Sequence, residues 1–399
     1  MRTIVEVKNG INWVGAIDWR VRDFHGYSTY KGTTYNAFLI QDEKTALFDT
    51  VKKPFKGDLL HNLYKVVDPA KIDYLVVNHV EPDHSGSMPE MMEIIKPEKV
   101  FCTARGKKAL IDHYHREDWP YEVVKTGDEL SLGKRTIQFI ETRMIHWPDS
   151  MFSYVKEDAV LFASDGFGQH WATSERFNDE VDASELMNHA AKYYANILTL
   201  YSPLIRKLLE SVLEMGLKID MICPDHGLIW RDNPMQIVEA YDRWSKQVPR
   251  RKALVVYDTM WESTRTMAKA IADGLIETGV STKMMDLSVD HRSDVMTEVL
   301  DAKAIILGSP TLNNTLLPRM ADFLCYMGGL RPANKIAAAF GSYGWSGEAV
   351  KLINNALEDM KIEVIDPGIR LQYVPEHDGL HKCVELGRKV GQAVKDAVG

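Results

Sequence analysis

The stretch "NHVEPDHSG" at residues 78–86 places four potential metal ligands directly after the apolar run "DYLVV" (73–77). These ligands are His79, Glu81, Asp83 and His84. The Ser and Gly that follow them allow the chain to turn sharply. Imidazoles and carboxylates are the side chains that bind transition metals, so the end of this strand is a candidate metal site.

Three other apolar strands end close to a potential ligand. His146 follows in "RMIHWPD", Asp165 in "LFASDGFG" and His226 in "ICPDHG". A single His after a strand is more typical of an ordinary core or surface position. Strand ends at one edge of a sheet converge in space, however, and a metal needs ligands from several segments. Four ligand-bearing turns in one domain therefore predict a metal centre.

The pattern of secondary structure changes near residue 249, which predicts two domains, 1–249 and 250–399. A chain of 399 residues is too long for one ordinary core. The first part has short apolar strands, predicted at 12–17, 36–40, 45–49, 73–77, 136–141, 151–155, 159–163 and 219–223. A helical pattern covers 184–215 and is expected to break at Pro203. After "SKQVPRRK" (245–252), apolar strands alternate with helices, which is typical of a parallel sheet covered on both faces.

Composition narrows the class of protein. Hydrophobic residues at 45% and charged residues at 26% are typical of a globular chain, and no apolar stretch reaches the roughly 18 residues of a membrane span. The first ten residues carry no export or import signal, so we expect a cytoplasmic protein. A net charge of −8 offers no basic field for nucleic acid.

The four cysteines are scattered and form no C-x-x-C pair, which excludes a built-in thiolate metal centre and suggests reduced thiols. We expect all four to be small buried side chains. They are Cys102, Cys223, Cys325 and Cys383.

The second domain has a candidate phosphate loop. In "VVYDTMWEST" (255–264) a strand runs into a Ser/Thr-rich turn before a helix, where backbone N–H groups and the helix dipole favour an anion. Alone, such a cluster is usually only a helix N-cap. The loops "SPTLNN" (309–314) and "GSYGWSG" (341–347) follow later strands, and carboxyl ends of parallel strands meet at one crevice. The three loops therefore predict one ligand site.

The pattern H-x-E-x-D-H with the distant His146, Asp165 and His226 resembles the binuclear site of the metallo-β-lactamase fold, with Glu81 in place of its usual second His. Together with the flavodoxin-like second part, the whole chain resembles the flavodiiron proteins, also called A-type flavoproteins or rubredoxin:oxygen oxidoreductases. The resemblance implies an α/β chain: an N-terminal metallo-β-lactamase-like αββα sandwich and a C-terminal flavodoxin-like doubly wound parallel sheet.

The resemblance also implies the cofactors, two iron ions and FMN. One iron would be held by His79, Glu81 and His146 and the other by Asp83 and His226, with Asp165 as the bridge. His84 either faces the metal or is replaced there by water. Replacing a His by Glu makes a harder, more anionic site, which suits iron better than zinc. Asp49 is expected to orient a ligand imidazole, and His25, His170 and Tyr194 are candidate pocket residues.

The implied FMN contacts come from the three loops of the second domain, although Trp261 and Glu262 replace the usual Thr-Gly of a flavodoxin phosphate loop. They are Thr259, Met260, Trp261, Glu262, Ser263, Thr264, Pro310, Thr311, Leu312, Asn313, Asn314, Ser342, Tyr343, Gly344, Trp345 and Gly347.

The implied activity is reduction of dioxygen to water, of nitric oxide to nitrous oxide, or of both. The chain has neither a Cys-rich rubredoxin segment nor a G-x-G-x-x-G nucleotide loop, so the electron donor is expected to be a separate protein such as rubredoxin. The family further implies a homodimer, or a dimer of dimers, in which the FMN of one chain faces the iron pair of its partner.

Two other functions fit parts of the sequence. A zinc hydrolase of the metallo-β-lactamase type would carry the flavodoxin-like domain as an appendage. An electron carrier would use the first domain only as a scaffold. Glu81 argues against the hydrolase, and the complete set of ligands argues against the carrier.

Overall fold

The computed structural model describes residues 5–398, which form two compact units. Unit 1 comprises the chain up to His25, Thr29–Tyr193 and Pro203–Asp242. Unit 2 comprises Gly26–Ser28, Tyr194–Ser202 and the chain from Arg243 onward. Each unit has its own sheets and cores, and each is described by itself.

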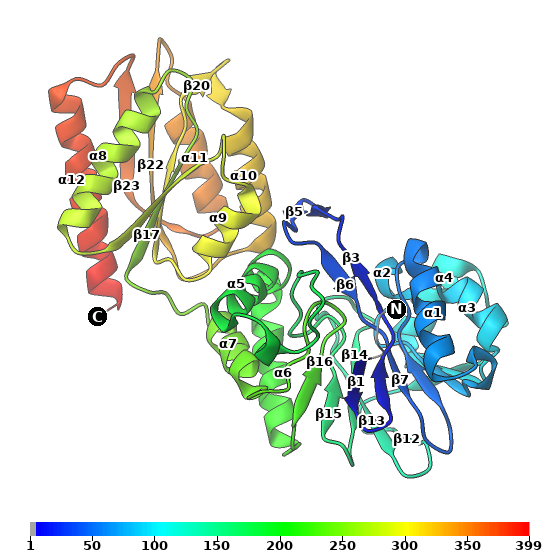
Figure 1. Cartoon of the computed structure of the whole chain (residues 1–399). Helices are drawn as coiled ribbons and strands as arrows, with labels where there is room; N and C mark the ends of the chain where they lie inside the picture. Colours follow the sequence, from blue (N-terminus) through cyan, green and yellow to red (C-terminus); the bar gives the residue numbers. More distant parts are fainter. Residues whose placement is uncertain (1–4, 399) are drawn as a thin grey trace. The chain divides into compact units, whose positions relative to one another are not determined.

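Unit 1 is built on two sheets (Figure 1). The first has the order β1 (Val5–Lys8), β2 (Ile11–Trp13), β7 (Phe38–Ile40), β8 (Ala46–Phe48), β9 (Tyr74–Val76), β10 (Lys99–Thr103) and β11 (Tyr121–Val124). The second has the order β12 (Glu129–Ser131), β13 (Thr136–Glu141), β14 (Met151–Val155), β15 (Val160–Phe162) and β16 (Met221–Cys223). Their facing side chains share one core, in which the Phe162 ring lies 4.5 Å from Phe48 and 5.0 Å from Phe38 between centroids.

Helices cover the outer faces of this sandwich. Leu59 of α1, Met91 of α3 and Leu110 of α4 join a second core with Leu47 and Leu75 of the first sheet. These helices span Lys56–Val66, Met88–Ile95 and Ala104–Tyr114. On the side of the second sheet lie α5 (Ala183–Tyr193), α6 (Ser202–Glu214) and α7 (Met235–Ser245) (Figure 1). The predicted αββα sandwich is confirmed.

Shorter elements lie between these strands and helices along the chain, and one of them, β5, belongs to unit 2. Strands β3 and β6 form a two-stranded sheet, and α2 carries part of the ligand stretch. The bounds are β3 Ala16–Asp18, β4 Asp23–Phe24, β5 Tyr27–Ser28, β6 Thr33–Tyr35, α2 Pro82–Ser85, and the 3₁₀ turns Lys53–Phe55, Pro69–Lys71 and Asn178–Glu180.

The long helix predicted over 184–215 is interrupted before Pro203 rather than at it. After α5 the chain forms a π-helical turn at Tyr194–Leu198 and a 3₁₀ turn at Thr199–Tyr201. Pro203 then lies in the first turn of α6, where its missing N–H leaves no helical hydrogen bond unmade.

Unit 2 is a parallel five-stranded sheet with the order β18–β17–β19–β22–β23. This is the flavodoxin-like order 2-1-3-4-5, so the predicted doubly wound sheet is confirmed. The strands are β17 Lys252–Tyr257, β18 Ser281–Asp286, β19 Ala304–Gly308, β22 Ile336–Tyr343 and β23 Glu363–Gln372, with a small hairpin of β20 (Thr311–Leu312) and β21 (Thr315–Leu316). The helices are α8 Ser263–Glu277, α9 Arg292–Val299, α10 Pro318–Leu330, α11 Ala349–Asp359 and α12 His377–Val398.

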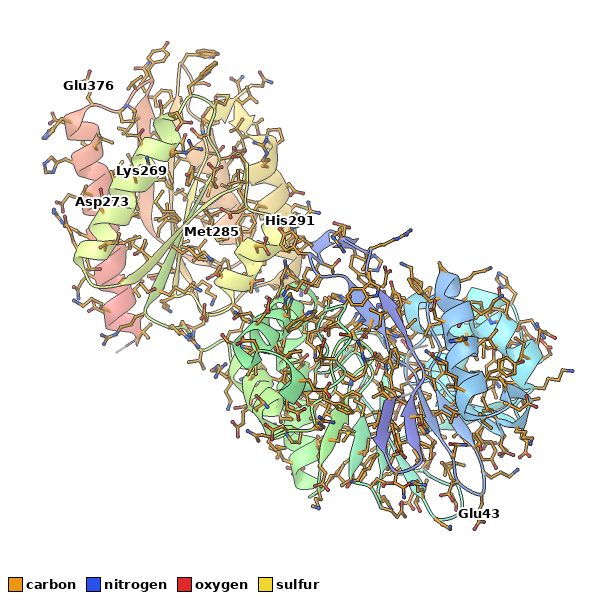
Figure 2. All side chains as sticks on the ribbon, viewed as in Figure 1. Glu43, Lys269, Asp273, Met285, His291 and Glu376 are labelled. Carbon is orange, nitrogen blue, oxygen red and sulfur yellow. The ribbon has the colours of Figure 1, made fainter. Side chains whose placement is uncertain are left out.

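Each face of this sheet has its own core. Residues of α9, α10 and α11 pack on one face, and those of α8 and α12 on the other. Figure 2 shows Lys269 and Asp273 on the exposed side of α8, whereas Met285 of β18 is buried.

Three of the four cysteines are buried, as predicted, but Cys325 is exposed on α10, so that part of the prediction is wrong. The apolar side of α10 is carried by residues such as Phe323 and Met327, which leaves Cys325 on its outer side. Among residues 5–398, no helix has both the length and the apolar character needed to cross a bilayer.

Because both cores of the parallel sheet lie almost wholly after residue 250, we expect residues 250–399 to fold alone and to bind FMN. Circular dichroism and flavin fluorescence titration of this fragment would check the expectation. An insoluble or flavin-free fragment would contradict the predicted boundary or the predicted loops.

Candidate metal centre and flavin site

All seven predicted ligands come together at one end of the two sheets of unit 1. His79, Glu81, Asp83 and His84 lie between β9 and α3, and His146 lies in the connection from β13 to β14. Strand register explains part of this convergence. β15 and β16 are parallel with Phe162 opposite Cys223, so Asp165 and His226 each lie three residues beyond a paired position.

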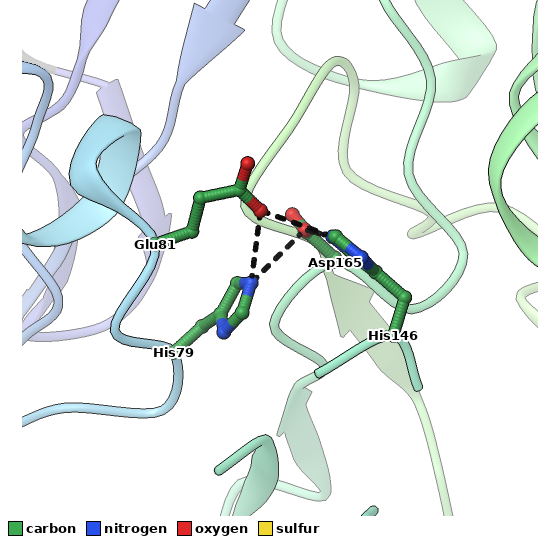
Figure 3. A group of neighbouring side chains, drawn as sticks. All are labelled: His79, Glu81, His146 and Asp165. Atoms are coloured by element: carbon green, nitrogen blue, oxygen red, sulfur yellow. Dashed lines mark hydrogen bonds and ion pairs between the residues drawn. The ribbon is translucent and has the colours of Figure 1, made fainter. Parts of the chain in front are cut away.

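A first cluster consists of His79, Glu81, His146 and Asp165 (Figure 3). The Nε2 atom of His79 lies 3.3 Å from Glu81 Oε2 and 3.5 Å from Asp165 Oδ2. The Nε2 atom of His146 lies 3.2 Å from the same Glu81 oxygen and 2.8 Å from the same Asp165 oxygen. Four donor atoms from four different chain positions thus surround one point.

A second cluster consists of Asp83, His84 and His226. Asp83 Oδ2 lies 3.2 Å from His226 Nε2 and 3.4 Å from His84 Nε2. The other oxygen of Asp165, Oδ1, lies 3.2 Å from His84 Nε2 and 3.5 Å from His226 Nε2. The two oxygens of Asp165 therefore face different clusters, and the His84 imidazole points into the site.

These spacings fit metal coordination. Two ligand atoms that are each about 2.1 Å from one ion are about 3.0 to 3.4 Å apart in octahedral or tetrahedral geometry. Several of the donor atoms are close to one another without hydrogen-bond geometry. Both oxygens of Asp83, Oδ1 of Asp165 and both nitrogens of His84 are buried and have no hydrogen-bond partner in the described part of the chain. Cations between the clusters would supply the missing partners.

Proton affinities reflect the same concentration of negative charge. Although burial lowers the pKa of His84, the carboxylates of Asp83 and Asp165 raise it to about 10. Burial likewise opposes the charge on His146, but Asp165 and Glu81 raise its pKa to about 9. Metal ions would take the place of these protons, so metal binding competes with protonation of the imidazoles.

Unit 2 has a pocket of about 360 Å³ where the predicted flavin loops meet. It is lined by Met260, Trp261, Ser263, Pro310, Thr311, Leu312, Asn313, Asn314, Ser342, Tyr343, Gly344 and Trp345, all of which were predicted. Ser346, Tyr373 and Val374 also line it and were missed. The latter two follow β23, a fourth strand end that carries no loop motif in the sequence.

Four predicted flavin contacts are not among the lining residues: Thr259, Glu262, Thr264 and Gly347. Thr264 is buried in α8, with its hydroxyl 3.0 Å from that of Ser342. Glu262 instead pairs with Arg265 at 2.6 Å. The Thr259 hydroxyl oxygen is buried and has no hydrogen-bond partner among the described residues, which fits a phosphate at this turn.

Comparison with known proteins supports both the metal-binding unit and the flavin-binding unit. Residues 33–227 match the family described as "ODP family beta lactamase", and residues 255–387 match the flavodoxin family. The chain is 51% identical to a nitric oxide reductase of Moorella thermoacetica, over 98% of this chain and 99% of that protein.

Two solved structures cover nearly the whole chain. Rubredoxin oxygen:oxidoreductase of Desulfovibrio gigas superposes with a TM-score of 0.98 at 44% identity, over 100% of both chains. The flavodiiron protein of Giardia intestinalis superposes with a TM-score of 0.96 at 37% identity, over 99% of this chain and 98% of that one.

The chain belongs to the flavodiiron protein family. It is accordingly an oxidoreductase, and its cofactors are FMN and a non-haem diiron centre.

Around the metal centre, contacts outside the ligand set fix the imidazoles of this flavodiiron protein. Asp149 Oδ2 lies 3.0 Å from His79 Nδ1 and also accepts a hydrogen bond from the Val80 amide at 2.7 Å. The Nδ1–H of His226 donates to the Thr34 carbonyl at 2.6 Å. Such partners hold a ligand imidazole in one tautomer with Nε2 directed at the metal.

The prediction that Asp49 orients an imidazole is wrong. Because Phe48 lies opposite Val76 in parallel strands, the Asp49 carboxylate reaches the backbone of the residues that follow β9. It accepts hydrogen bonds from the Asn78 amide and side chain, each at 2.8 Å, and from the His79 amide at 3.3 Å. Asp49 therefore fixes the turn that carries His79, and Asp149 fixes the ring.

Asp225 is a further possible metal ligand that the sequence does not predict. Its Oδ2 lies 4.0 Å from His84 Nδ1, and together with His84 and Asp165 it forms a third possible metal-binding group. Burial, together with the nearby Asp49, raises the pKa of its carboxyl group well above the usual value. "ICPDHG" contains this carboxylate, but nothing in the sequence distinguishes it from a turn-forming Asp.

The three candidate pocket residues have different positions. His25 Nε2 lies 3.2 Å from Glu81 Oε1, and its side chain is 76% exposed. His170 is buried beside His226, at 4.7 Å between ring centroids. Tyr194 does not have the predicted position, because its hydroxyl lies 2.9 Å from that of Ser202 in unit 2. Its neighbour Tyr193 packs on His170 and His226 instead.

We expect Asp149→Asn to lower iron affinity by about 10- to 100-fold, because the amide keeps the shape and the contact with Val80 but no longer accepts strongly from the His79 ring. Competition with a chelator, followed by iron analysis, measures the effect. Asp118→Asn, at a 66% exposed side chain, is the control. Equal iron retention in both variants would contradict the role of Asp149.

Proposed function

We propose that this flavodiiron protein reduces dioxygen to water, nitric oxide to nitrous oxide, or both, with electrons that pass from a separate donor protein through FMN. The main support is the position of the Asp165 carboxylate. One of its oxygens faces the His79 cluster, and the other faces the Asp83 cluster. A carboxylate shared in this way suits two adjacent metals, and two metals suit a small substrate held between them.

In this proposal His79, Glu81 and His146 hold one iron, and Asp83, His84 and His226 hold the other, with Asp165 as the bridge. His84 is included because its imidazole is buried and directed at Asp83 and Asp165. Glu81, Asp83 and Asp165 provide three anionic ligands, which favour iron over zinc. The proposed cofactor pair supplies the redox chemistry, since FMN accepts electrons singly or in pairs.

The protein's own side chains position the ligands and give access to protons. His25 bridges solvent and Glu81, because its ring is mostly exposed and its Nε2 lies 3.2 Å from Glu81 Oε1. We infer that it passes protons to the iron site by this oxygen. Phe24, Tyr193 and His170 surround His226 and exclude bulk water from that side.

The electron donor in this proposal is rubredoxin or a similar small protein, in line with the name of the Desulfovibrio gigas relative. We also propose that the protein is cytoplasmic and forms a homodimer, or a dimer of dimers, in which each FMN faces the iron pair of the partner chain. Support comes from the rim of the flavin pocket, where Trp261 is 87% and Trp345 86% exposed. Such an apolar rim is typical of a surface that another protein covers.

A zinc hydrolase is not favoured. It would need an imidazole-rich site, whereas the position between His79 and Asp83 holds a buried Glu81. The whole-length match to reductases argues the same way, since it includes the flavin domain.

We expect His79→Asn or Asp83→Asn to abolish reductase activity while FMN stays bound, because each removes a buried iron ligand and the flavin loops lie in the other unit. Gas-electrode assays with dioxygen and nitric oxide, together with flavin absorbance, measure both properties. His61→Asn, at an exposed histidine of α1, is the control. Normal turnover by either ligand variant would overturn the assignment.

Subunit mixing tests the proposed dimer. One inactive protein carries Asp83→Asn, and the other carries Thr259→Glu and Ser263→Glu, which repel the FMN phosphate. A mixed dimer contains one intact FMN opposite one intact iron pair, so activity should return on subunit exchange. If verified mixed dimers stay inactive while both parents remain folded, electron transfer occurs within one chain.

A further inference from the structure

Unit 1 contains a second cavity, separate from the metal centre and from the flavin pocket. Its volume is about 280 Å³, and its lining side chains are all apolar, apart from one glycine. They come from α6 and α7, from strands β14 and β15, from the loop after β15 and from the connection between α6 and β16. Figure 1 shows these helices beside the β16 edge of the second sheet. Apolar side chains give water no hydrogen-bond partner, so the space that they enclose is expected to be poorly hydrated.

The inner end of the cavity is formed by Phe152 and Phe167, which are 1% and 4% exposed. Phe167 is two residues from Asp165, the carboxylate that both metal clusters share. Between them lies Gly166, where an added Cβ would be 3.0 Å from the Phe152 ring. The cavity thus ends against the back of the loop that carries Asp165.

This inner wall is held firmly. The Phe167 amide donates to the Tyr241 hydroxyl at 2.9 Å, and the Phe167 carbonyl accepts from the Trp230 indole N–H at 2.9 Å. The Phe167 ring also packs on Tyr241, at 4.6 Å between centroids. A wall fixed by two hydrogen bonds and a ring contact does not readily collapse to fill the space beside it.

The outer end reaches the surface at the end of α6. Leu213 is 64% exposed there, and a Cβ added to Gly216 would meet no other atom within 4 Å. The half-buried Val212 lies between this mouth and the interior. The cavity therefore runs from exposed side chains at the end of α6 to the loop that carries Asp165.

Dioxygen and nitric oxide are small, uncharged and poorly hydrated, so they partition from water into apolar space. The metal centre itself is lined by charged carboxylates and imidazoles, which retain water. We propose that the apolar cavity bounded by Phe152, Phe167 and Val212 holds uncharged diatomic gas beside the loop that carries Asp165 and so raises its supply to the metal centre. This inference rests on the proposed function, because it takes the substrate class from it.

Xenon is the probe for this site, since it is an apolar atom that occupies dry cavities. Crystals of the iron- and FMN-loaded protein under xenon pressure should contain xenon beside Phe152 and Phe167. Val212→Trp should fill the space, with Val238→Phe as a second variant on the other lining helix. Leu204→Trp, on α6 but outside the cavity, is the matched control.

We expect both filling variants to lose xenon and to raise the KM for dioxygen or nitric oxide several-fold, with kcat at saturating gas and the contents of iron and FMN unchanged. The control should keep the wild-type xenon site and KM. Absence of xenon from the wild type, or filling variants with the KM of the control, would overturn the inference. A loaded wild type that binds xenon but reduces neither gas would contradict the proposed function, and with it the role of the cavity in gas supply.

Discussion

The sharing of the Asp165 carboxylate between two groups of ligands is the constraint on which the rest of unit 1 depends. One oxygen must reach His79 and His146 while the other reaches His84 and His226. That is possible only if the ends of β9, β15 and β16 and the connection from β13 to β14 meet at one place. The register of the parallel β15–β16 pair satisfies part of this requirement, because it carries Asp165 and His226 the same distance past their strands.

Without bound cations, such a site lowers the stability of the folded protein. Removing one partner from a buried ion pair costs about 3 to 5 kcal/mol, because the remaining charge is left in a poor solvent. Several buried carboxylates converge here, and Asp83 and Asp165 have oxygens without a hydrogen-bond partner among the described residues. The cores between the sheets and beneath the helices compensate for this local cost and keep the ligands in place.

The ligand set could be predicted because every ligand follows an apolar strand, and the ends of these strands meet at one end of the two sheets of unit 1. The site residues that the sequence does not reveal are those whose roles arise from tertiary contacts. Asp149 and Asp225 resemble ordinary turn residues until the fold brings them to His79 and His84. The sequence predicts Tyr194 as a pocket residue, but the chain changes to a π-helical turn there, and Tyr193 packs on His170 and His226 instead. Tyr373 and Val374 lie past a strand without any loop motif.

One chain of this protein carries both a binuclear iron site and FMN. Iron and zinc analysis of the purified protein, combined with its visible spectrum, tests this most directly. We expect about two iron ions per chain, as in a binuclear site, together with the absorption bands of oxidised flavin. Zinc at the metal site without flavin, or flavin without metal, would contradict it.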